Sequence, residues 1–134
     1  MKTKPAITTS DVLINHLETL TQDTPIYVSL NGTDPDFTIT HIEDSTSVGW
    51  YEIRIRDFKD RNQYCLDTVE KLVRALKKET SDDFIYVTKC NSAPMDIITE
   101  IIYSELHQCY LMNILHNVGF DDVEWLHNEV IVKD

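Results

Sequence analysis

The segment of residues 50–56 alternates between apolar and charged side chains, and this alternation constrains the fold more than any other stretch of the sequence. On an extended chain the two kinds of side chain fall on opposite sides, Tyr51, Ile53 and Ile55 against Glu52, Arg54 and Arg56. Successive side chains of a strand point to opposite faces of its sheet. The pattern therefore predicts a strand with one face on a core and the other in water.

Three other segments have the composition of strands. Residues 26–30, 37–42 and 84–88 are rich in β-branched and aromatic side chains. The turn-forming cluster of residues 31–36 separates the first two, and a loop over residues 43–49 leads into the alternating segment. We expect the strands over residues 26–30, 37–42 and 50–56 to form an antiparallel meander.

Two helices are predicted beside these strands. Ser10 is a candidate N-cap for the first, whose apolar stripe includes Leu13 and Leu17 and which must end before Pro25. Asp67 and Glu70 have the spacing of a capping box at the start of the second. A narrow apolar stripe follows it, so both helices should cover the sheet with one face.

The region over residues 94–118 allows two interpretations. Pro94 suits the first turn of a helix, and apolar residues from Ile97 onward form a broad side that Gly119 would terminate, so we predict a third helix. Four isoleucines also allow a strand over residues 96–103, followed by a shorter helix. Residues 123–127 and 129–132 suggest a terminal hairpin around Asn128.

The predicted fold class is α+β, in the order α-β-β-β-α-β-α with an optional terminal hairpin. We expect a single domain over residues 9–134 behind a flexible N-terminus of residues 1–8, because 134 residues suit one core. The domain should contain an antiparallel sheet of about four strands with helices packed on one face. We find no internal repeat.

Several sequence features favour a cytoplasmic protein. No run approaches the ~20 apolar residues of a membrane span, and no apolar stretch follows the charged N-terminal residues as it would in a signal peptide. The three cysteines, Cys65, Cys90 and Cys109, are widely spaced and odd in number. Reduced thiols in a cytosol are the natural interpretation, and we expect no membrane association.

No motif for catalysis, metal binding or nucleotide binding is recognisable. The three glycines are too few and too scattered for a phosphate-binding loop. A zinc site built from His107, Cys109 and His116, with Cys90 or Cys65, lacks the paired short spacings of structural zinc sites. Cys65 is the best candidate nucleophile, because it precedes a helix, but no base is near it in sequence. We therefore predict a protein that is not an enzyme and holds no metal or cofactor.

Charge is sorted along the chain. Residues 5–53 contain eight acids and no base, residues 54–78 contain eight bases and four acids, and residues 91–134 contain eight acids and one base. The formal net charge is −11, opposite to that of most nucleic-acid-binding proteins. We therefore expect no direct contact with nucleic acid.

Much of the acidic charge falls in predicted loops, where carboxylates are free to contact a partner. The candidate partner-binding residues are Asp34, Asp36, Glu43, Asp44, Asp82, Asp83, Asp121 and Asp122. One hypothesis is that they imitate nucleic-acid phosphates and bind the basic surface of a nucleic-acid-processing protein. The alternative is that they only keep the chain soluble.

A basic strip crosses the middle of the chain. It consists of Arg54, Arg56, Lys59, Arg61 and Lys71. It could hold a small anionic ligand, or the acidic surface of a second copy in a homodimer.

Five short segments of the chain are similar to known sequences: residues 11–13 and 22–28 and, more narrowly, residues 30–34, 38–40 and 68–72. Through them the chain resembles small acidic proteins of phages and mobile elements of Gram-positive bacteria. These last segments are similar to anti-CRISPR proteins that block the type II-A CRISPR nuclease. The resemblance covers about half of the chain and implies a non-enzymatic inhibitor whose loop carboxylates act as a DNA mimic.

Two other functions are carried as alternatives. The first is an oligomeric structural or adaptor protein without DNA mimicry, in which Tyr103, Tyr110 and Trp125 on and after the third helix form an interface. The second is an enzyme of unfamiliar type that uses Cys65 or a histidine.

Overall fold

The computed structural model describes residues 3–7, 9–45, 47, 49–89, 96–115, 123–126 and 129–133. Within these ranges the chain forms two α-helices, one 3-10 helix and nine strands. In chain order they are β1 (Thr3–Ala6), α1 (Ser10–Leu17), β2 (Ile26–Ser29), β3 (Phe37–Ser45), β4 (Trp50–Asp57), η1 (Phe58–Asp60), α2 (Val69–Glu79), β5 (Ile85–Lys89), β6 (Ile97–Ser104), β7 (Cys109–Leu115), β8 (Val123–Leu126) and β9 (Glu129–Lys133).

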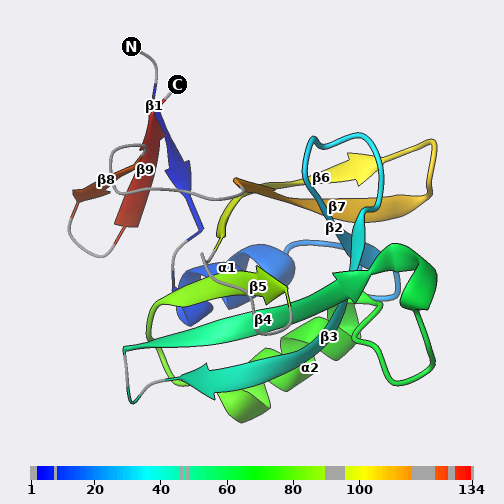
Figure 1. Cartoon of the computed structure of the whole chain (residues 1–134), viewed down its shortest axis with the longest axis horizontal. Coiled ribbons are helices and arrows are strands. Elements are labelled where there is room, and N and C mark those ends of the chain that lie inside the picture. Colours follow the sequence, from blue (N-terminus) through cyan, green and yellow to red (C-terminus); the bar gives the residue numbers. More distant parts are fainter. Residues whose placement is uncertain are drawn as a thin grey trace.

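Six strands form one mixed sheet in the order β5-β4-β3-β2-β7-β6. The sheet is curled into a half-barrel (Figure 1). Its edge strands β5 and β6 meet at one antiparallel bridge, where the amides of Val87 and Asp96 each donate to the other residue's carbonyl, at 2.9 and 2.8 Å. The curl places the apolar inner faces of the strands around a common core with the two helices.

A second, three-stranded sheet joins the two ends of the chain. Its order is β1-β9-β8, and both pairs are antiparallel, with Thr3 opposite Lys133 (Figure 1). The predicted terminal hairpin is confirmed by the β8–β9 pair. Residues 3–6, which fall in the segment expected to be flexible, form strand β1.

The predicted fold class is wrong in two respects, although α1, β2, β3, β4, α2 and β5 all occur near their predicted positions. The sheet has six strands and is mixed, because β2 pairs with β7 and β4 pairs with β5 in parallel. The meander β2-β3-β4 is antiparallel, as expected. The predicted third helix over residues 94–118 is also wrong, since the antiparallel strands β6 and β7 occupy its described part.

A β-bulge explains why the apolar spacing of β6 predicts a helix. The register between β6 and β7 shifts between Ile98 and Glu100. A bulge inserts one extra residue and resets the alternation of faces. Apolar residues three apart, such as Ile98 and Ile101, therefore both contact the core, and this spacing imitates one face of a helix.

The N-cap residue of each α-helix lies one position from the residue predicted for it. The N-cap of α1 is Thr9 rather than Ser10, and that of α2 is Thr68 rather than Asp67. Each threonine hydroxyl accepts from the amide three residues on, at 3.3 Å from Val12 and 3.2 Å from Lys71. Both caps have extended backbone, as an N-cap requires.

The two α-helices introduce two copies of the same αβββ unit, contrary to our reading of the sequence as free of repeats. The first copy is α1-β2-β3-β4 and the second is α2-β5-β6-β7. A constant offset of 59 residues relates them, and 15 of the 49 positions over residues 9–57 carry the same residue 59 positions later. The most similar stretch has Ile26, Tyr27 and Val28 in the first repeat and Ile85, Tyr86 and Val87 in the second.

The backbone pairing follows the same offset. The contact of Val28 with Phe37 in the first repeat corresponds to that of Val87 with Asp96 in the second. The parallel pair β2–β7 corresponds to β5–β4, so each repeat joins the other at two places. The half-barrel is thus built from two related units rather than from one.

Side chains at the bulges repeat as well. In the first repeat Thr40 Oγ1 donates to the Arg54 carbonyl at 3.1 Å, and in the second Thr99 Oγ1 donates to the Asn113 carbonyl at 3.1 Å. Glu18 and Lys77, which are equivalent positions, pair with each other at 2.7 Å between the two helices. A residue can meet its own equivalent in this way only near the axis that relates the repeats.

Candidate functional site

The structure divides the predicted carboxylates between two ends of strand β3. Asp36 precedes this strand and Glu43 lies near its end, seven residues later. At about 3.3 Å per strand residue, roughly 23 Å separates them. Asp121 and Asp122 lie outside the described residues. The six described carboxylates therefore do not form one compact cluster.

Four of them lie at the same end of the sheet, and we call Glu43, Asp44, Asp82 and Asp83 the acidic end. Asp44 is opposite Tyr51 on β4, and Tyr51 is in turn opposite Ile85 at the start of β5. Two strand spacings amount to about 10 Å. The loop from α2 to β5, which carries Asp82 and Asp83, thus ends beside the end of β3.

Local hydrogen bonds hold the acidic end in place. Asp82 Oδ1 accepts from the amide of Asp11 at 3.4 Å, which brings a further carboxylate to the group. Asp83 accepts through Oδ1 from the amide of Phe84 at 2.8 Å and through its carbonyl from the amide of Ser10 at 2.9 Å. Glu43 Oε2 lies 3.0 Å from His41 Nε2.

The other two carboxylates shape the loop between β2 and β3. Asp36 Oδ2 accepts from the amide of Leu30 at 2.8 Å, so its first role is to hold the turn. Asp34 Oδ1 lies 3.1 Å from Nε2 of His107, which precedes β7. This contact connects the first repeat to the second beside a pocket.

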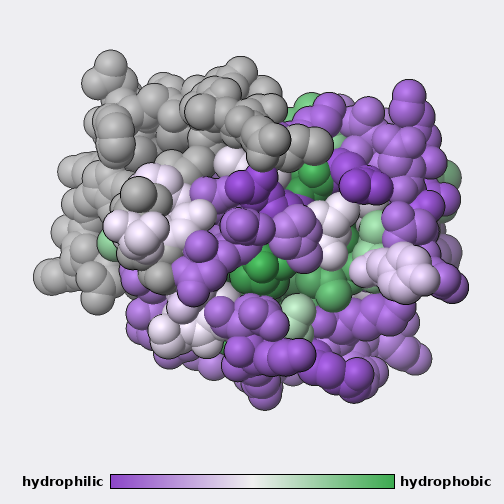
Figure 2. All heavy atoms as spheres, turned by 60° about the horizontal axis from the view of Figure 1, so that its bottom comes forward, coloured by the Kyte–Doolittle hydropathy of each residue, from purple (hydrophilic) through white to green (hydrophobic). Residues whose placement is uncertain are grey.

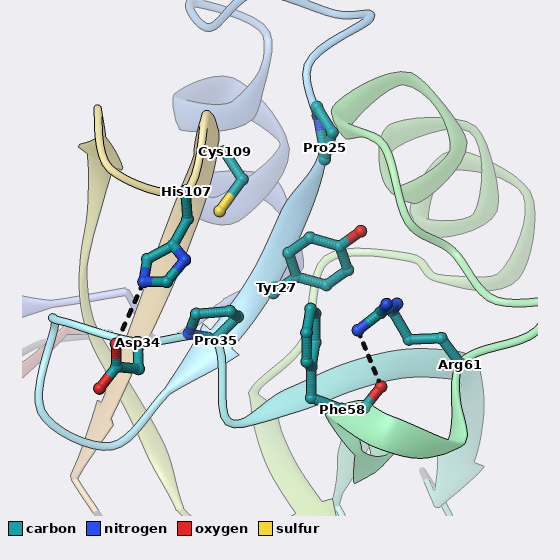
Figure 3. Close-up of a pocket in the computed structure, with 8 residues that line it drawn as sticks. All are labelled: Pro25, Tyr27, Asp34, Pro35, Phe58, Arg61, His107 and Cys109. Atoms are coloured by element: carbon teal, nitrogen blue, oxygen red, sulfur yellow. Dashed lines mark hydrogen bonds and ion pairs between the residues drawn. The ribbon is translucent and has the colours of Figure 1, made fainter.

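The pocket has a volume of about 400 Å³ and opens between the start of β7 and η1 (Figure 3). Its floor is Tyr27 of β2, and Phe58 of η1 packs edge-to-face against the Tyr27 ring with centroids 4.8 Å apart. Cys109 and His107 form the opposite wall. Burial raises the pKa of Tyr27, and the Arg61 guanidinium opposes this rise.

Arg61 lies on the rim of this pocket with its guanidinium stacked on an aromatic ring. Its Cζ is 3.6 Å from the Phe58 ring centroid, and its Nη1 donates to the Phe58 carbonyl at 3.1 Å. Stacking and this hydrogen bond hold the guanidinium in one position. Within the described ranges Arg61 makes no ion pair with a carboxylate.

A buried carboxylate that sequence reasoning missed lies at the centre of a separate network. Glu52 is only 8% exposed. Its Oε1 is 2.9 Å from both Thr88 Oγ1 and Arg54 Nε, and its Oε2 accepts from Trp50 Nε1 at 2.9 Å and from Ser45 Oγ at 3.1 Å. Burial opposes the charged form, but the hydrogen bonds and the charge of Arg54 outweigh it and hold the pKa of Glu52 below its usual value.

Two of the five residues of the basic strip have carboxylate partners. Arg54 pairs with Glu52, and Lys71 pairs with Asp67 at 2.9 Å. Among the residues that the structure describes, Arg56, Lys59 and Arg61 form no ion pair with a carboxylate. These three lie on β4, on η1 and just after η1, next to the pocket.

The structure describes two of the three cysteines and two of the three aromatic side chains on which the alternative functions rest. Cys65 and Cys109 are buried free thiols, and burial raises the pKa of Cys109. In the described part of the chain no group of three metal-ligating side chains occurs. Tyr103 and Tyr110 pack edge-to-face across the β6–β7 pair with ring centroids 5.4 Å apart, so they lie on strands and not on the predicted third helix.

The described part of one face of the molecule is largely hydrophilic (Figure 2). Figure 2 shows one face covered mainly by hydrophilic side chains, with apolar side chains visible in the hollows between them. Within the described residues, neither α-helix combines the length and the apolar character that crossing a membrane requires.

The chain was compared with protein-family models, with curated proteins and with solved structures, and none of the three comparisons yields a match.

Proposed function

We propose that the protein is a non-enzymatic binding protein whose acidic end contacts the basic, nucleic-acid-binding surface of a protein partner. The observation that carries the proposal is the gathering of Glu43, Asp44, Asp82 and Asp83 at one end of the sheet, in a chain of net charge −11. Asp11 adds a fifth carboxylate there.

The distribution of the bases supports this proposal. Four of the bases that follow Arg56 pair with acids outside the acidic end: Lys71 with Asp67, Arg74 with Glu70, Lys77 with Glu18 and Lys89 with Asp57. The charge of these bases is therefore compensated elsewhere. A surface of one sign attracts a partner of the opposite sign and accelerates its association in a salt-dependent way.

The resemblance to anti-CRISPR proteins supplies a specific partner to test. The partner class is a type II-A CRISPR nuclease loaded with guide RNA, whose site for the DNA motif beside the target is basic. In this form of the proposal the acidic end competes with target DNA for that site.

The test is to measure binding of the chain to the loaded nuclease by biolayer interferometry, with and without competing target DNA. The acidic-end variant carries Glu43→Gln, Asp44→Asn, Asp82→Asn and Asp83→Asn. A control with the same change in net charge carries Asp23→Asn, Asp60→Asn, Glu100→Gln and Glu105→Gln, all at exposed positions. Asp23 is the repeat equivalent of Asp82, so it matches the altered loop closely.

We expect the acidic-end variant to bind at least about tenfold more weakly and the control less than about threefold more weakly, because close charge pairs depend on position and not only on net charge. Binding should also weaken as salt rises. Equal binding by the two variants, or no binding by the parent chain, would reject the acidic end as the contact surface for this partner.

A further inference from the structure

The pocket beside β7 marks a difference between two otherwise equivalent places in the repeats. Tyr27 and Tyr86 are equivalent, and so are the residues that face them, Cys109 and Trp50. In one copy the Trp50 ring packs edge-to-face against Tyr86 with centroids 6.0 Å apart. In the other copy the small Cys109 leaves the corresponding side of Tyr27 open to the pocket. One copy is filled where the other is hollow.

The hollow copy offers flat apolar surfaces. Tyr27 and Phe58 meet at an angle of 89°, so together they present a ring face and a ring edge. Pro25 and Pro35 complete the apolar lining (Figure 3). Aromatic pairs favour such edge-to-face geometry, and an added ring can extend it. A volume of about 400 Å³ falls within the range of small-molecule sites.

The polar groups of the pocket differ between its two sides. On one side Arg61 is held by Phe58, and since Nη1 donates to the Phe58 carbonyl, the guanidinium keeps its other N–H groups for a ligand. The Tyr27 hydroxyl points toward this side (Figure 3). A guanidinium and a phenol hydroxyl are donors suited to a planar carboxylate.

The other side disfavours an anion. His107 lies within hydrogen-bond distance of Asp34 there, and the Asp34 side chain is 63% exposed. The negative charge of Asp34 repels a second anion, while Cys109 adds a small apolar surface. A ligand with one anionic end therefore has a single favoured orientation, with that end toward Arg61.

We propose that this pocket binds a small aromatic carboxylate, with its ring against Tyr27 and Phe58 and its carboxylate on the Arg61 guanidinium. The site does not depend on the acidic end or on any protein partner. Residues 56–61 carry three bases and two acids, so the segment around Arg61 is less acidic than a chain of net charge −11 is as a whole.

The experiment uses benzoate as the probe, titrated into the full chain and followed by two-dimensional amide and aromatic NMR. Benzamide, acetate and inorganic phosphate are the comparison ligands. Benzamide keeps the ring and loses the charge, acetate keeps the carboxylate and loses the ring, and phosphate tests for simple anion binding. We expect saturable shifts with benzoate at the amides of Tyr27, Phe58, Arg61 and Cys109, and binding at least about tenfold weaker for each comparison ligand.

Two variants locate the site. Arg61→Gln should weaken benzoate binding about tenfold, because it removes a charge-assisted contact at a partly exposed position. Arg56→Gln is the matched control, since Arg56 is an exposed arginine nearby that does not line the pocket, and it should change binding less than threefold. Cys109→Trp copies the filled state of the other repeat and should abolish binding.

Arg61 is exposed, so its variant is expected to fold, and the result does not depend on whether Cys109→Trp folds. Absence of saturable shifts with benzoate, equal affinity for benzoate and phosphate, or unchanged benzoate binding by Arg61→Gln would each overturn the proposal. The acidic-end variant should bind benzoate as the parent does, so failure of one proposal leaves the other standing.

Discussion

Replacing Glu52 with glutamine should destabilise the protein strongly while preserving side-chain shape. Each carboxylate oxygen of Glu52 faces two donors, Thr88 and Arg54 on Oε1 and Trp50 and Ser45 on Oε2. Whichever way a glutamine amide turns, its NH₂ group replaces one of these oxygens. That NH₂ group then faces Arg54 Nε or Trp50 Nε1, which can only donate, whereas the facing hydroxyl of Thr88 or Ser45 can turn and accept from it.

The magnitude follows from this count. A buried donor left without an acceptor costs about 1–3 kcal/mol, and each contact that keeps a neutral partner loses the roughly 1 kcal/mol by which a charged partner strengthens it. The Glu52 and Arg54 side chains are 11% and 20% exposed, which lets water compensate in part. We expect Glu52→Gln to lower the free energy of unfolding by about 2–4 kcal/mol at pH 7, well within the 5–15 kcal/mol of a typical domain.

The pH dependence provides a second, independent check. The pKa of Glu52 is lower in the folded chain than its usual value, so its carboxylate stabilises the fold above the unfolded pKa and this contribution is lost as pH falls through the folded pKa. The difference between the parent and Glu52→Gln should be constant from about pH 6 to pH 8 and should shrink below about pH 4.

Urea unfolding followed by circular dichroism measures both quantities. Glu43→Gln is the control, because Glu43 lies directly opposite Glu52 in the β3–β4 register but its side chain is 45% exposed, and it should cost at most about 0.5 kcal/mol. A loss below about 1 kcal/mol for Glu52→Gln, or a loss that is the same at pH 3 and pH 7, would refute the assignment of Glu52 as a buried, charged acceptor.

Three further predictions concern the repeats and the thiols. Thr9→Ala and Thr68→Ala should each lower the free energy of unfolding by about 1 kcal/mol in urea titrations, because the two hydroxyls cap equivalent helices, and a large difference between them would contradict that equivalence. Gln108→Gly should raise the free energy of unfolding by up to about 1 kcal/mol and so raise the thermal midpoint slightly, because Gln108 has φ 54° where the equivalent residue is Gly49. A lowered midpoint would show that the Gln108 side chain stabilises the turn. Cys65 and Cys109 should react with Ellman's reagent much more slowly in the native chain than in urea, since both are buried and the pKa of Cys109 is raised, and rapid native reaction of either thiol would show that it is exposed.

The predictable part of the fold is the part in which local pattern and final environment agree. The alternation over residues 50–56 and the stripe of α2 both face one core, so periodicity alone located β4 and α2. In β6 a bulge after Ile98 gave a strand the apolar spacing of a helix. The order of strands in the sheet also does not follow from local sequence patterns, because the parallel partners β2 and β7 are far apart in the sequence.

The two repeats differ in charge, and this difference obscures their similarity in the sequence. The first repeat contains no base before Arg54, whereas lysines and arginines crowd α2, so equivalent surface positions such as Glu18 and Lys77 have opposite sign. The buried positions that carry the similarity, including Leu13 with Leu72 and Ile39 with Ile98, are few and widely spaced. An explicit comparison of the chain with itself at fixed offsets would have found them.

The candidate sites were predictable only in part. Loop carboxylates could be chosen from composition, but which of them meet depends on the register of β3, β4 and β5. The pocket depends on contacts such as Asp34 with His107, 73 residues apart. No local signal in the sequence relates such positions.

The way in which the repeats are joined has a consequence for folding on the ribosome. Strand β2 finds its parallel partner only when β7 emerges, since Ile26 pairs with Tyr110, 84 residues later. At roughly 5–20 residues per second, synthesis leaves that edge without its partner for about 4–17 seconds. Pairing over so long a separation is also intrinsically slow. A nascent first repeat exposes an open strand edge during this interval, and the absence of any base over residues 5–53 gives every such chain the same sign of charge. Mutual repulsion between nascent chains would then protect the edge until the second repeat covers it.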